Sequence, residues 1–193
     1  TVGPSLHQLF QKSFQAAKWA RTHTGVGKGN VSASNVSVNL ATRIFGKLSE
    51  VRILVLGTGD VGESTARALQ SRGARRITVS GRTPEKAQLL ANSINGNILP
   101  FEKFPNEMHH FDIVICSTGA GRILLTLKMV EEALHKRPLH PLFLIDLAVP
   151  RNVDPASSAL ANLFLYDLDD VATIANENLK GRIKQIDSCR QVL

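Results

Sequence analysis

The chain has 193 residues, of which 43% are hydrophobic and 5% aromatic, and its formal net charge at pH 7 is +7. This length allows one well-packed domain with additional helices, and no apolar run is long enough to span a membrane. The positive charge is compatible with a phosphorylated cofactor or RNA, but so few aromatic residues argue against a base-stacking surface. Two separated cysteines and six histidines without ligand spacing argue against a disulfide framework or a metal site.

Two helices are expected before the first strand. Apolar residues at helical spacing predict a helix from Pro4 to His23. A glycine-rich loop from Gly25 to Asn30 ends that helix. Ser32 or Ser34 is expected to cap a second helix, which ends near Gly46. Because the chain begins at Thr1, we expect these helices to connect to a segment upstream.

A strand, a glycine-rich loop and a helix follow one another in the next segment. The apolar run from Val51 to Leu56 predicts a buried parallel strand, and ESTARAL predicts the helix. Between them, GTGDVG matches G-x-G-x-x-G, in which Gly57 allows a tight turn, Gly59 lets a pyrophosphate approach and Gly62 lets the helix pack closely. A glycine-rich turn without a ligand is the alternative. The predicted phosphate-binding residues are Gly57, Thr58, Gly59, Asp60, Val61 and Gly62.

The end of the second strand predicts the choice of cofactor. This strand runs from Arg76 to Ser80, and Pro84 opens the helix that follows. A carboxylate at the strand end would bind the ribose 2′-hydroxyl of NAD, whereas this segment offers the Arg82 guanidinium and two hydroxyl groups, which suit the 2′-phosphate of NADP. The alternative is that Arg82 only caps a turn. The predicted residues at this end of the site are Ser80, Gly81, Arg82, Thr83 and Lys86.

The second half of the chain continues the alternation of strands and helices. A helix is expected from Gly121 to Lys136. Further strands are expected at Ile98–Pro100, Phe111–Cys116, Leu142–Leu147 and Leu163–Tyr166. We expect the nicotinamide ribose to lie beside the small polar residues that follow the fourth strand, Ser117, Thr118 and Gly119.

Two side chains in these later strands could be read in more than one way. Asp146 ends a buried strand, where a carboxylate needs hydrogen bonds. It is a candidate cofactor-binding residue, and a role in pinning the following loop fits equally well. Cys116 is interpreted as a small buried hydrophobe rather than a nucleophile.

Six strands that alternate with helices predict an α/β fold with a doubly wound parallel sheet. The expected architecture is Rossmann-like, with strand order 3-2-1-4-5-6 and right-handed crossovers. Two extra N-terminal helices and a C-terminal helix complete the prediction. The C-terminal helix is expected from Asp169 onward and has too little chain left to pack on.

Four stretches resemble the glutamyl-tRNA reductase family in the family's own order. They are Leu9–Ala41, Val55–Leu69 with the glycine loop, Leu144–Pro155 (LIDLAVPRNVDP) and Leu165–Arg182 (LYDLDDVATIANENLKGR). The chain departs from the family at Gly81, where members usually have Asn before Arg-Thr. It also lacks the family's Thr-Cys-Asn-Arg motif, which carries the nucleophilic cysteine.

The resemblance implies a division of labour along the chain. Residues 1–49 would be a helical linker from an N-terminal catalytic domain, residues 50–167 an NADP-binding Rossmann domain, and residues 168–193 the start of a helix toward a dimerisation domain. In the full enzyme, a thiolate attacks glutamyl-tRNA, and NADPH reduces the resulting thioester to glutamate-1-semialdehyde for tetrapyrrole biosynthesis. This chain would bind and orient the hydride carrier, and no catalytic or metal-binding residue is assigned within it.

The resemblance also implies partners and a location. Glutamyl-tRNA would bind through domains outside this chain, the full enzyme would be a homodimer, and an aminomutase would accept the aldehyde. The full enzyme would involve no membrane, and its expected location is the cytoplasm, or the plastid stroma in a plant.

Two other functions remain open from the sequence. A shikimate-dehydrogenase-like NADP oxidoreductase shares the glycine loop and Arg-Thr, but it does not share LAVPRNVDP and needs a substrate domain with a lysine–aspartate pair. A non-catalytic NADP-binding module would have the same pocket and no turnover.

Overall fold

The computed structural model describes residues 3, 6, 8–15 and 32–174. The chain divides into two compact units, Thr1–Ser32 and Ala33–Leu193. In the first unit, residues 6 and 8–15 are helical, as predicted. The remainder of the predicted Pro4–His23 helix and the Gly25–Asn30 loop lie outside the described residues. Across the described ranges, no helix is long and apolar enough to cross a lipid bilayer.

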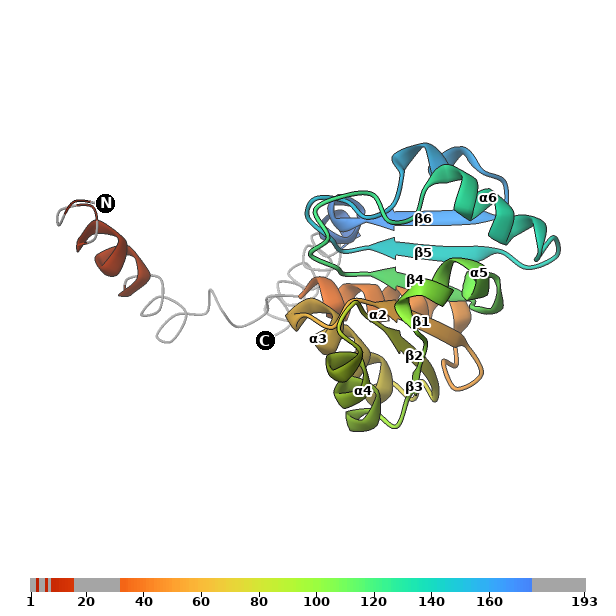
Figure 1. Ribbon diagram of the computed structural model, residues 1–193, viewed down its shortest axis with the longest axis horizontal. Coiled ribbons are helices and arrows are strands. Elements are labelled where there is room, and N and C mark those ends of the chain that lie inside the picture. Colours follow the sequence, from red (N-terminus) through yellow and green to blue (C-terminus); the bar gives the residue numbers. More distant parts are fainter. Residues whose placement is uncertain (1–2, 4–5, 7, 16–31, 175–193) are drawn as a thin grey trace, which may run out of the picture. The chain divides into compact units, whose positions relative to one another are not determined.

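A six-stranded parallel sheet forms the centre of the second unit (Figure 1). Its order is β3-β2-β1-β4-β5-β6, which confirms the predicted doubly wound topology. The strands are β1 (Arg52–Leu56), β2 (Arg76–Ser80), β3 (Asn97–Ile98), β4 (Ile113–Cys116), β5 (Leu142–Asp146) and β6 (Leu163–Asp167). Because all strands are parallel, the loops that follow β1, β2 and β4 meet at one edge.

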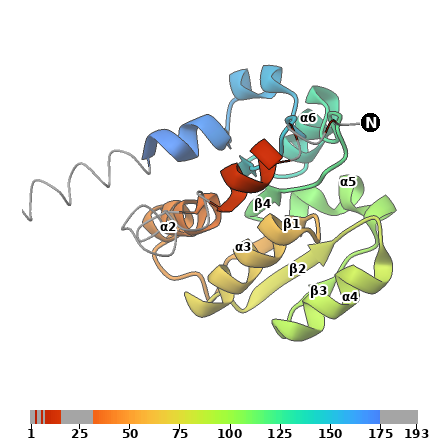
Figure 2. The ribbon, with the colours of Figure 1, turned by 90° about the vertical axis from the view of Figure 1, so that its left-hand side faces the viewer.

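Helices cover both faces of this sheet (Figures 1 and 2). α2 and α3 pack together, α4 packs along β2 and β3, and α5 packs against α6. The α-helices are α2 (Ala33–Phe45), α3 (Asp60–Ser71), α4 (Pro84–Ser93), α5 (Phe104–Glu107) and α6 (Leu127–His135), and 3-10 turns span Phe101–Lys103, Met108–His110 and Pro155–Ala159. The chain is helical again from 168 to 174, where the described residues end.

The apolar run that predicted β1 is buried on both sides. Leu54 and Leu56 pack with Val114 of β4 against Val130 and Ala133 of α6. Ile53 and Val55 of β1 point to the opposite face, since side chains alternate along a strand, and they are also fully buried. Burial on both faces explains why the strand is continuously apolar rather than alternating.

The start of α6 differs from the prediction, whereas the start of α2 agrees with one of the two predicted caps. The helix expected from Gly121 begins only at Leu127. The backbone N–H groups of Leu124 and Leu125 instead donate to the carbonyl oxygen of Asn152 at 2.7 and 3.0 Å, so this segment runs beside the loop after β5. Near the start of the chain, α2 begins at Ala33, directly after Ser32, which is one of the two predicted cap residues, whereas Ser34 lies inside the helix.

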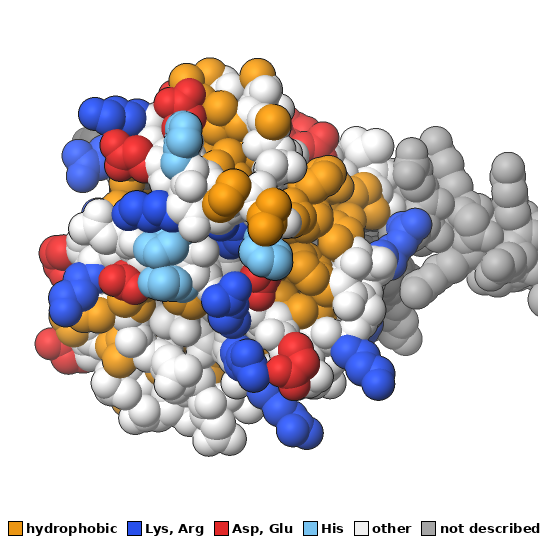
Figure 3. All heavy atoms as spheres, turned by 90° about the vertical axis from the view of Figure 1, so that its right-hand side faces the viewer, with side chains coloured by type: hydrophobic (Ala, Val, Ile, Leu, Met, Phe, Trp, Pro, Cys, Tyr) orange, Lys and Arg blue, Asp and Glu red, His pale blue; other side chains and the backbone are white. Residues whose placement is uncertain are grey.

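A buried arginine and one aspartate organise the amino-terminal edge of the sheet. Asp112 accepts hydrogen bonds from the backbone N–H and the guanidinium of Arg52 at 2.9 and 3.0 Å, and it lies 3.5 Å from Arg137. The Arg137 side chain is 5% exposed and also donates to the backbone carbonyls of Phe111 and Pro141. Lysine, arginine and histidine side chains gather on the face that includes this edge (Figure 3).

The pKa of Asp112 follows from these contacts. Burial by itself would raise this pKa, but the hydrogen bonds from Arg52 and the charges of Arg52 and Arg137 outweigh it, so the pKa lies below its ordinary value of 3.8. A carboxyl group with a lowered pKa stabilises the fold when it is ionised. This stabilisation is complete above pH 3.8 and is lost as the pH falls from there toward the folded-state pKa.

We expect Asp112→Asn to lower the free energy of unfolding by about 1–2 kcal/mol at neutral pH, because the buried Arg137 loses its counter-charge. The difference from the wild type should narrow as the pH falls below 3.8. Urea unfolding across this pH range measures both effects. Glu102→Gln, at an exposed residue, is the matched control. A difference that stays constant with pH would contradict the ionic role of Asp112.

Candidate functional site

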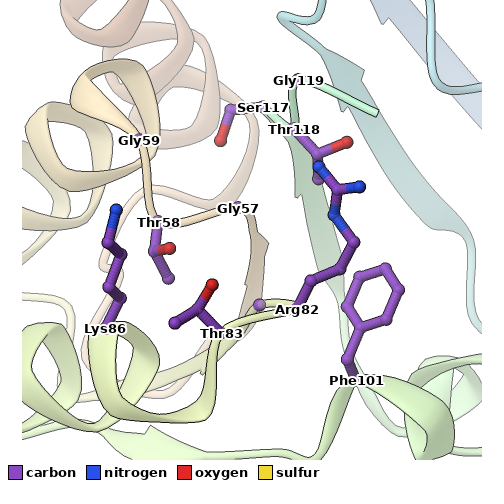
Figure 4. A pocket seen from close by; sticks show the side chains of 11 residues that line it. Gly57, Thr58, Gly59, Arg82, Thr83, Lys86, Phe101, Ser117, Thr118 and Gly119 are labelled. Carbon is purple, nitrogen blue, oxygen red and sulfur yellow. The ribbon is translucent and has the colours of Figure 1, made fainter. Parts of the chain in front are cut away.

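A pocket of about 170 Å³ opens at the carboxyl edge of the sheet, where the predicted site residues converge (Figure 4). It is formed by the loops after β1, β2 and β4, together with the segment after β3. None of the described residues that line it is acidic. The lining residues are Gly57, Thr58, Gly59, Gly81, Arg82, Thr83, Lys86, Phe101, Ser117, Thr118 and Gly119.

Two of the three motif glycines are required by the protein's own packing. Gly57 has a φ of +116°, and a Cβ atom there would lie 2.6 Å from the carbonyl oxygen of Ser117. A Cβ atom on Gly62 would lie 2.2 Å from the carbonyl oxygen of Gly57. Because neither residue has a side chain, the start of α3 can pack directly against the end of β1, as predicted for a dinucleotide-binding loop.

Gly59 differs from the other two glycines. A Cβ atom at this position would meet no protein atom within 4 Å, so nothing in the protein itself calls for a glycine here. Gly59 is also the N-cap of α3, and no side chain caps that helix end. The uncapped N–H groups and the helix dipole suit an anion, and the open space leaves room for one.

Two cations on the loop and helix after β2 have no partner among the described residues. Arg82 and Lys86 are exposed, and neither forms a hydrogen bond or ion pair within the part of the chain that the structure describes. In Figure 4, the Lys86 ammonium group points toward Gly59, and the Arg82 side chain runs beside Phe101 toward Thr118. With Thr83 between them, they form a cationic wall that a phosphate could neutralise.

Phe101 is a pocket residue that the sequence did not reveal. It lies in a segment for which no helix or strand is predicted, and it begins a 3-10 turn after β3. Its ring packs on Phe104 with centroids 5.1 Å apart, and Phe104 is 3% exposed. The core therefore anchors the ring that forms this side of the pocket. Two phenylalanines three residues apart, directly after a strand, were the available signal.

Five predicted residues lie outside the pocket lining. Asp60, Val61 and Gly62 form the first turn of α3. Ser80 is fully buried, and its carbonyl oxygen accepts the backbone N–H of Gly57 at 2.9 Å. Ser80 therefore fixes the glycine loop through its backbone.

Asp146, the fifth of these residues, holds the loop after β5. Its carboxylate is 1% exposed and accepts the backbone N–H groups of Ala148, Asn152 and Val153 at 3.1, 2.7 and 2.8 Å. Burial raises the pKa of this carboxyl, and the three N–H groups oppose the rise. Of the two roles that the sequence left open for Asp146, these contacts support the structural one, in which it holds the following loop.

Cys116 lies beside Asp146 in the register of β4 and β5. It is fully buried, and burial together with the Asp146 charge raises the pKa of its thiol well above 9.0. The thiol therefore stays protonated and inert at neutral pH, as the sequence predicted. No group of three or more His, Cys, Asp or Glu residues within the described ranges could hold a metal ion.

The contrast between two motif glycines can be tested by alanine substitution. We expect Gly62→Ala to lower the free energy of unfolding by about 2–3 kcal/mol, because its Cβ atom would overlap the backbone. Gly59→Ala, its matched control in open space, should change stability by less than about 1 kcal/mol. Urea unfolding at neutral pH gives both values. Similar losses for the two variants would refute the distinction.

The comparisons with known proteins agree with this geometry. The family model described as shikimate / quinate 5-dehydrogenase matches residues 39–174. A glutamyl-tRNA reductase from Aquifex aeolicus is 42% identical over 185 residues, which cover 96% of this chain and 45% of the relative. Another from Priestia megaterium is 41% identical over 193 residues, covering 100% of this chain and 43% of the relative. The chain thus spans a little under half the length of these curated relatives.

Solved structures give the same picture. Glutamyl-tRNA reductase from Methanopyrus kandleri has a TM-score of 0.74 and 33% identity, over 97% of this chain and 47% of that one. The nucleotide-binding domain of the Thermoplasma volcanium enzyme, at 21% identity and a TM-score of 0.59, shares the fold over 80% of this chain and 98% of its own. The chain therefore belongs to the family that the shikimate / quinate 5-dehydrogenase model describes, and the relatives named above that match nearly all of it are glutamyl-tRNA reductases.

Proposed function

We propose that this chain is the cofactor-binding domain of a glutamyl-tRNA reductase and that its cofactor is NADPH. One observation carries the proposal. Beside the open Gly59 position, Arg82 and Lys86 face a pocket, and among the described residues they have no partner and the pocket lining has no acidic residue. An acidic residue at the end of β2 would favour NAD, and β2 ends instead in Ser80. The similarity to glutamyl-tRNA reductases over nearly the whole of this chain supports the assignment of the enzyme.

The residues of the pocket divide among the parts of a dinucleotide. The glycine loop and the start of α3 would hold the pyrophosphate. Arg82, Thr83 and Lys86 would hold the 2′-phosphate, because two cations and a hydroxyl group match a dianion. The nicotinamide half would lie toward Ser117, Thr118 and Gly119 at the end of β4.

The chemistry of this proposal is divided between the cofactor and the protein. NADPH, when bound, supplies a hydride, and the protein binds and orients it. Cys116 cannot serve as the nucleophile, because its buried thiol stays protonated. No catalytic residue is therefore assigned within the described part of the chain. The thiolate that forms the thioester would belong to a catalytic domain, and the full enzyme would make glutamate-1-semialdehyde for tetrapyrrole biosynthesis.

The remaining parts of the proposal follow from the family resemblance. Residues 1–49 would be the linker from the catalytic domain, residues 50–167 the NADP-binding domain, and residues 168–193 the beginning of the helix toward a dimerisation domain. We also propose a homodimeric full enzyme that binds glutamyl-tRNA through its other domains, passes the aldehyde to an aminomutase and works in the cytoplasm.

Arg82 is the residue that should discriminate between the two nicotinamide cofactors. We expect Arg82→Ala to weaken NADPH binding by about 1.5–3 kcal/mol, the contribution of a charge-assisted hydrogen bond, and to leave NADH binding nearly unchanged. Calorimetric titration of both cofactors measures this difference. The matched control is Arg75→Ala, an exposed arginine outside the pocket. Equal losses for NADPH and NADH would show that Arg82 has a structural role instead.

The chain by itself should bind NADPH without turnover. We expect no glutamate-1-semialdehyde from glutamyl-tRNA and no NADP-dependent oxidation of shikimate, because neither a nucleophile nor a substrate domain is present among the described residues. Single-turnover assays that follow NADPH absorbance test both reactions. Semialdehyde formation would refute the assignment of catalysis to another domain, and shikimate oxidation would favour the shikimate-dehydrogenase alternative.

A further inference from the structure

Thr118, which forms the pocket wall at the end of β4, is held in place by Asn152, a residue that does not line the pocket. The backbone N–H and the hydroxyl group of Thr118 both donate to the side-chain oxygen of Asn152, at 3.1 and 2.8 Å. The Thr118 hydroxyl oxygen also accepts the backbone N–H of Ala120 at 3.3 Å. Thr118 is 9% exposed and Asn152 is fully buried. Asn152 therefore fixes both the backbone and the side-chain rotamer of Thr118.

Asn152 is itself fixed by contacts on every side. Its backbone N–H donates to Asp146 at 2.7 Å, and its side-chain NH₂ donates to the carbonyl oxygen of Arg122 at 3.2 Å. Its carbonyl oxygen accepts the N–H groups of Leu124 and Leu125. The side chain uses one oxygen as acceptor and one nitrogen as donor, a combination that an amide supplies and a carboxylate or an aliphatic group does not.

Asn152 thereby ties the loop after β4 to the loop after β5. The cationic wall of Arg82, Thr83 and Lys86 comes from different elements, the loop after β2 and α4, and forms no hydrogen bond with Asn152. A substitution at Asn152 should therefore displace the pocket wall after β4 and leave the cationic wall after β2 in place.

We propose that Asn152 is a positioning residue for the nicotinamide half of the cofactor. It does not line the pocket, and it acts through Thr118. The proposal rests on the proposed function, because it requires a nicotinamide dinucleotide in this pocket. In a doubly wound sheet, the second half of a dinucleotide lies at the end of the strand that follows the crossover, which is β4 here. Small displacements of such a wall alter the position of the reacting ring.

A comparison of two ligands tests this assignment. NADPH occupies both halves of the pocket, whereas adenosine 2′,5′-bisphosphate carries only the adenosine half. We expect Asn152→Ala to weaken NADPH binding about tenfold, because the backbone N–H and the hydroxyl group of Thr118 lose the acceptor that they share. Binding of the bisphosphate should change by less than about twofold, since the glycine loop, the loop after β2 and α4, which would hold it, form no hydrogen bond with Asn152. Asn106→Ala, at an exposed asparagine, is the matched control.

The outcomes separate this proposal from the proposed function. Equal weakening of both ligands, or no weakening of either, would overturn the role of Asn152. A wild-type chain that binds neither ligand would overturn the proposed function instead.

If Asn152→Ala fails to fold, Thr118→Val decides the matter, because it removes only the hydroxyl group and keeps the side-chain shape. We expect this variant to weaken NADPH binding about threefold and to leave the bisphosphate unaffected. The fluorescence of bound NADPH provides a second readout, since it reports on the surroundings of the nicotinamide ring. An unchanged affinity and an unchanged spectrum in Thr118→Val would also overturn the proposal.

Discussion

A single buried carboxylate, that of Asp146, determines the course of the chain at the carboxyl edge of the sheet. Burial makes its ionised form unfavourable, and the loop after β5 compensates by turning three backbone N–H groups toward it. That turn brings Asn152 to a fully buried position beside the loop after β4. A buried carboxylate without hydrogen bonds would be too costly, so Asp146 holds the loop that carries Asn152. The position of Thr118 in the pocket wall therefore depends on Asp146, which does not line the pocket.

The two sides of the pocket are built by different physical means. On the glycine side, the requirement is steric: the backbone oxygens of Gly57 and Ser117 occupy the space that side chains at Gly62 and Gly57 would need. On the β4 side, the requirement is polar, since hydrogen bonds between two loops hold Thr118 in place. Steric packing of this kind depends on a few neighbouring residues, whereas the polar arrangement depends on every donor finding its acceptor.

The distribution of charge also separates structural from functional cations. Arg52 and Arg137 share Asp112, and Arg151 pairs with Asp167, so each of these arginines stabilises a loop or an edge. Arg82 and Lys86 face the pocket without a partner in the described part of the chain. Cations left unpaired beside an uncapped helix end favour an anionic ligand, because the ligand would supply the missing counter-charge.

The sequence by itself determined the positions of the main strands, the glycine loop and the cationic segment after β2, because each of these rests on residues that are adjacent in the chain. The strand order followed from their alternation with helices, through the general rules for doubly wound sheets. Apolar runs specify buried strands, G-x-G-x-x-G specifies a turn, and Gly81-Arg82-Thr83 follows a strand directly. Only the tertiary structure decided the place of Phe101, the late start of α6 and the contacts of Asn152. The hydrogen bonds between Thr118 and Asn152 join residues that are 34 positions apart. No local pattern encodes such a pairing, because it exists only once parallel β4 and β5 bring their carboxyl ends together.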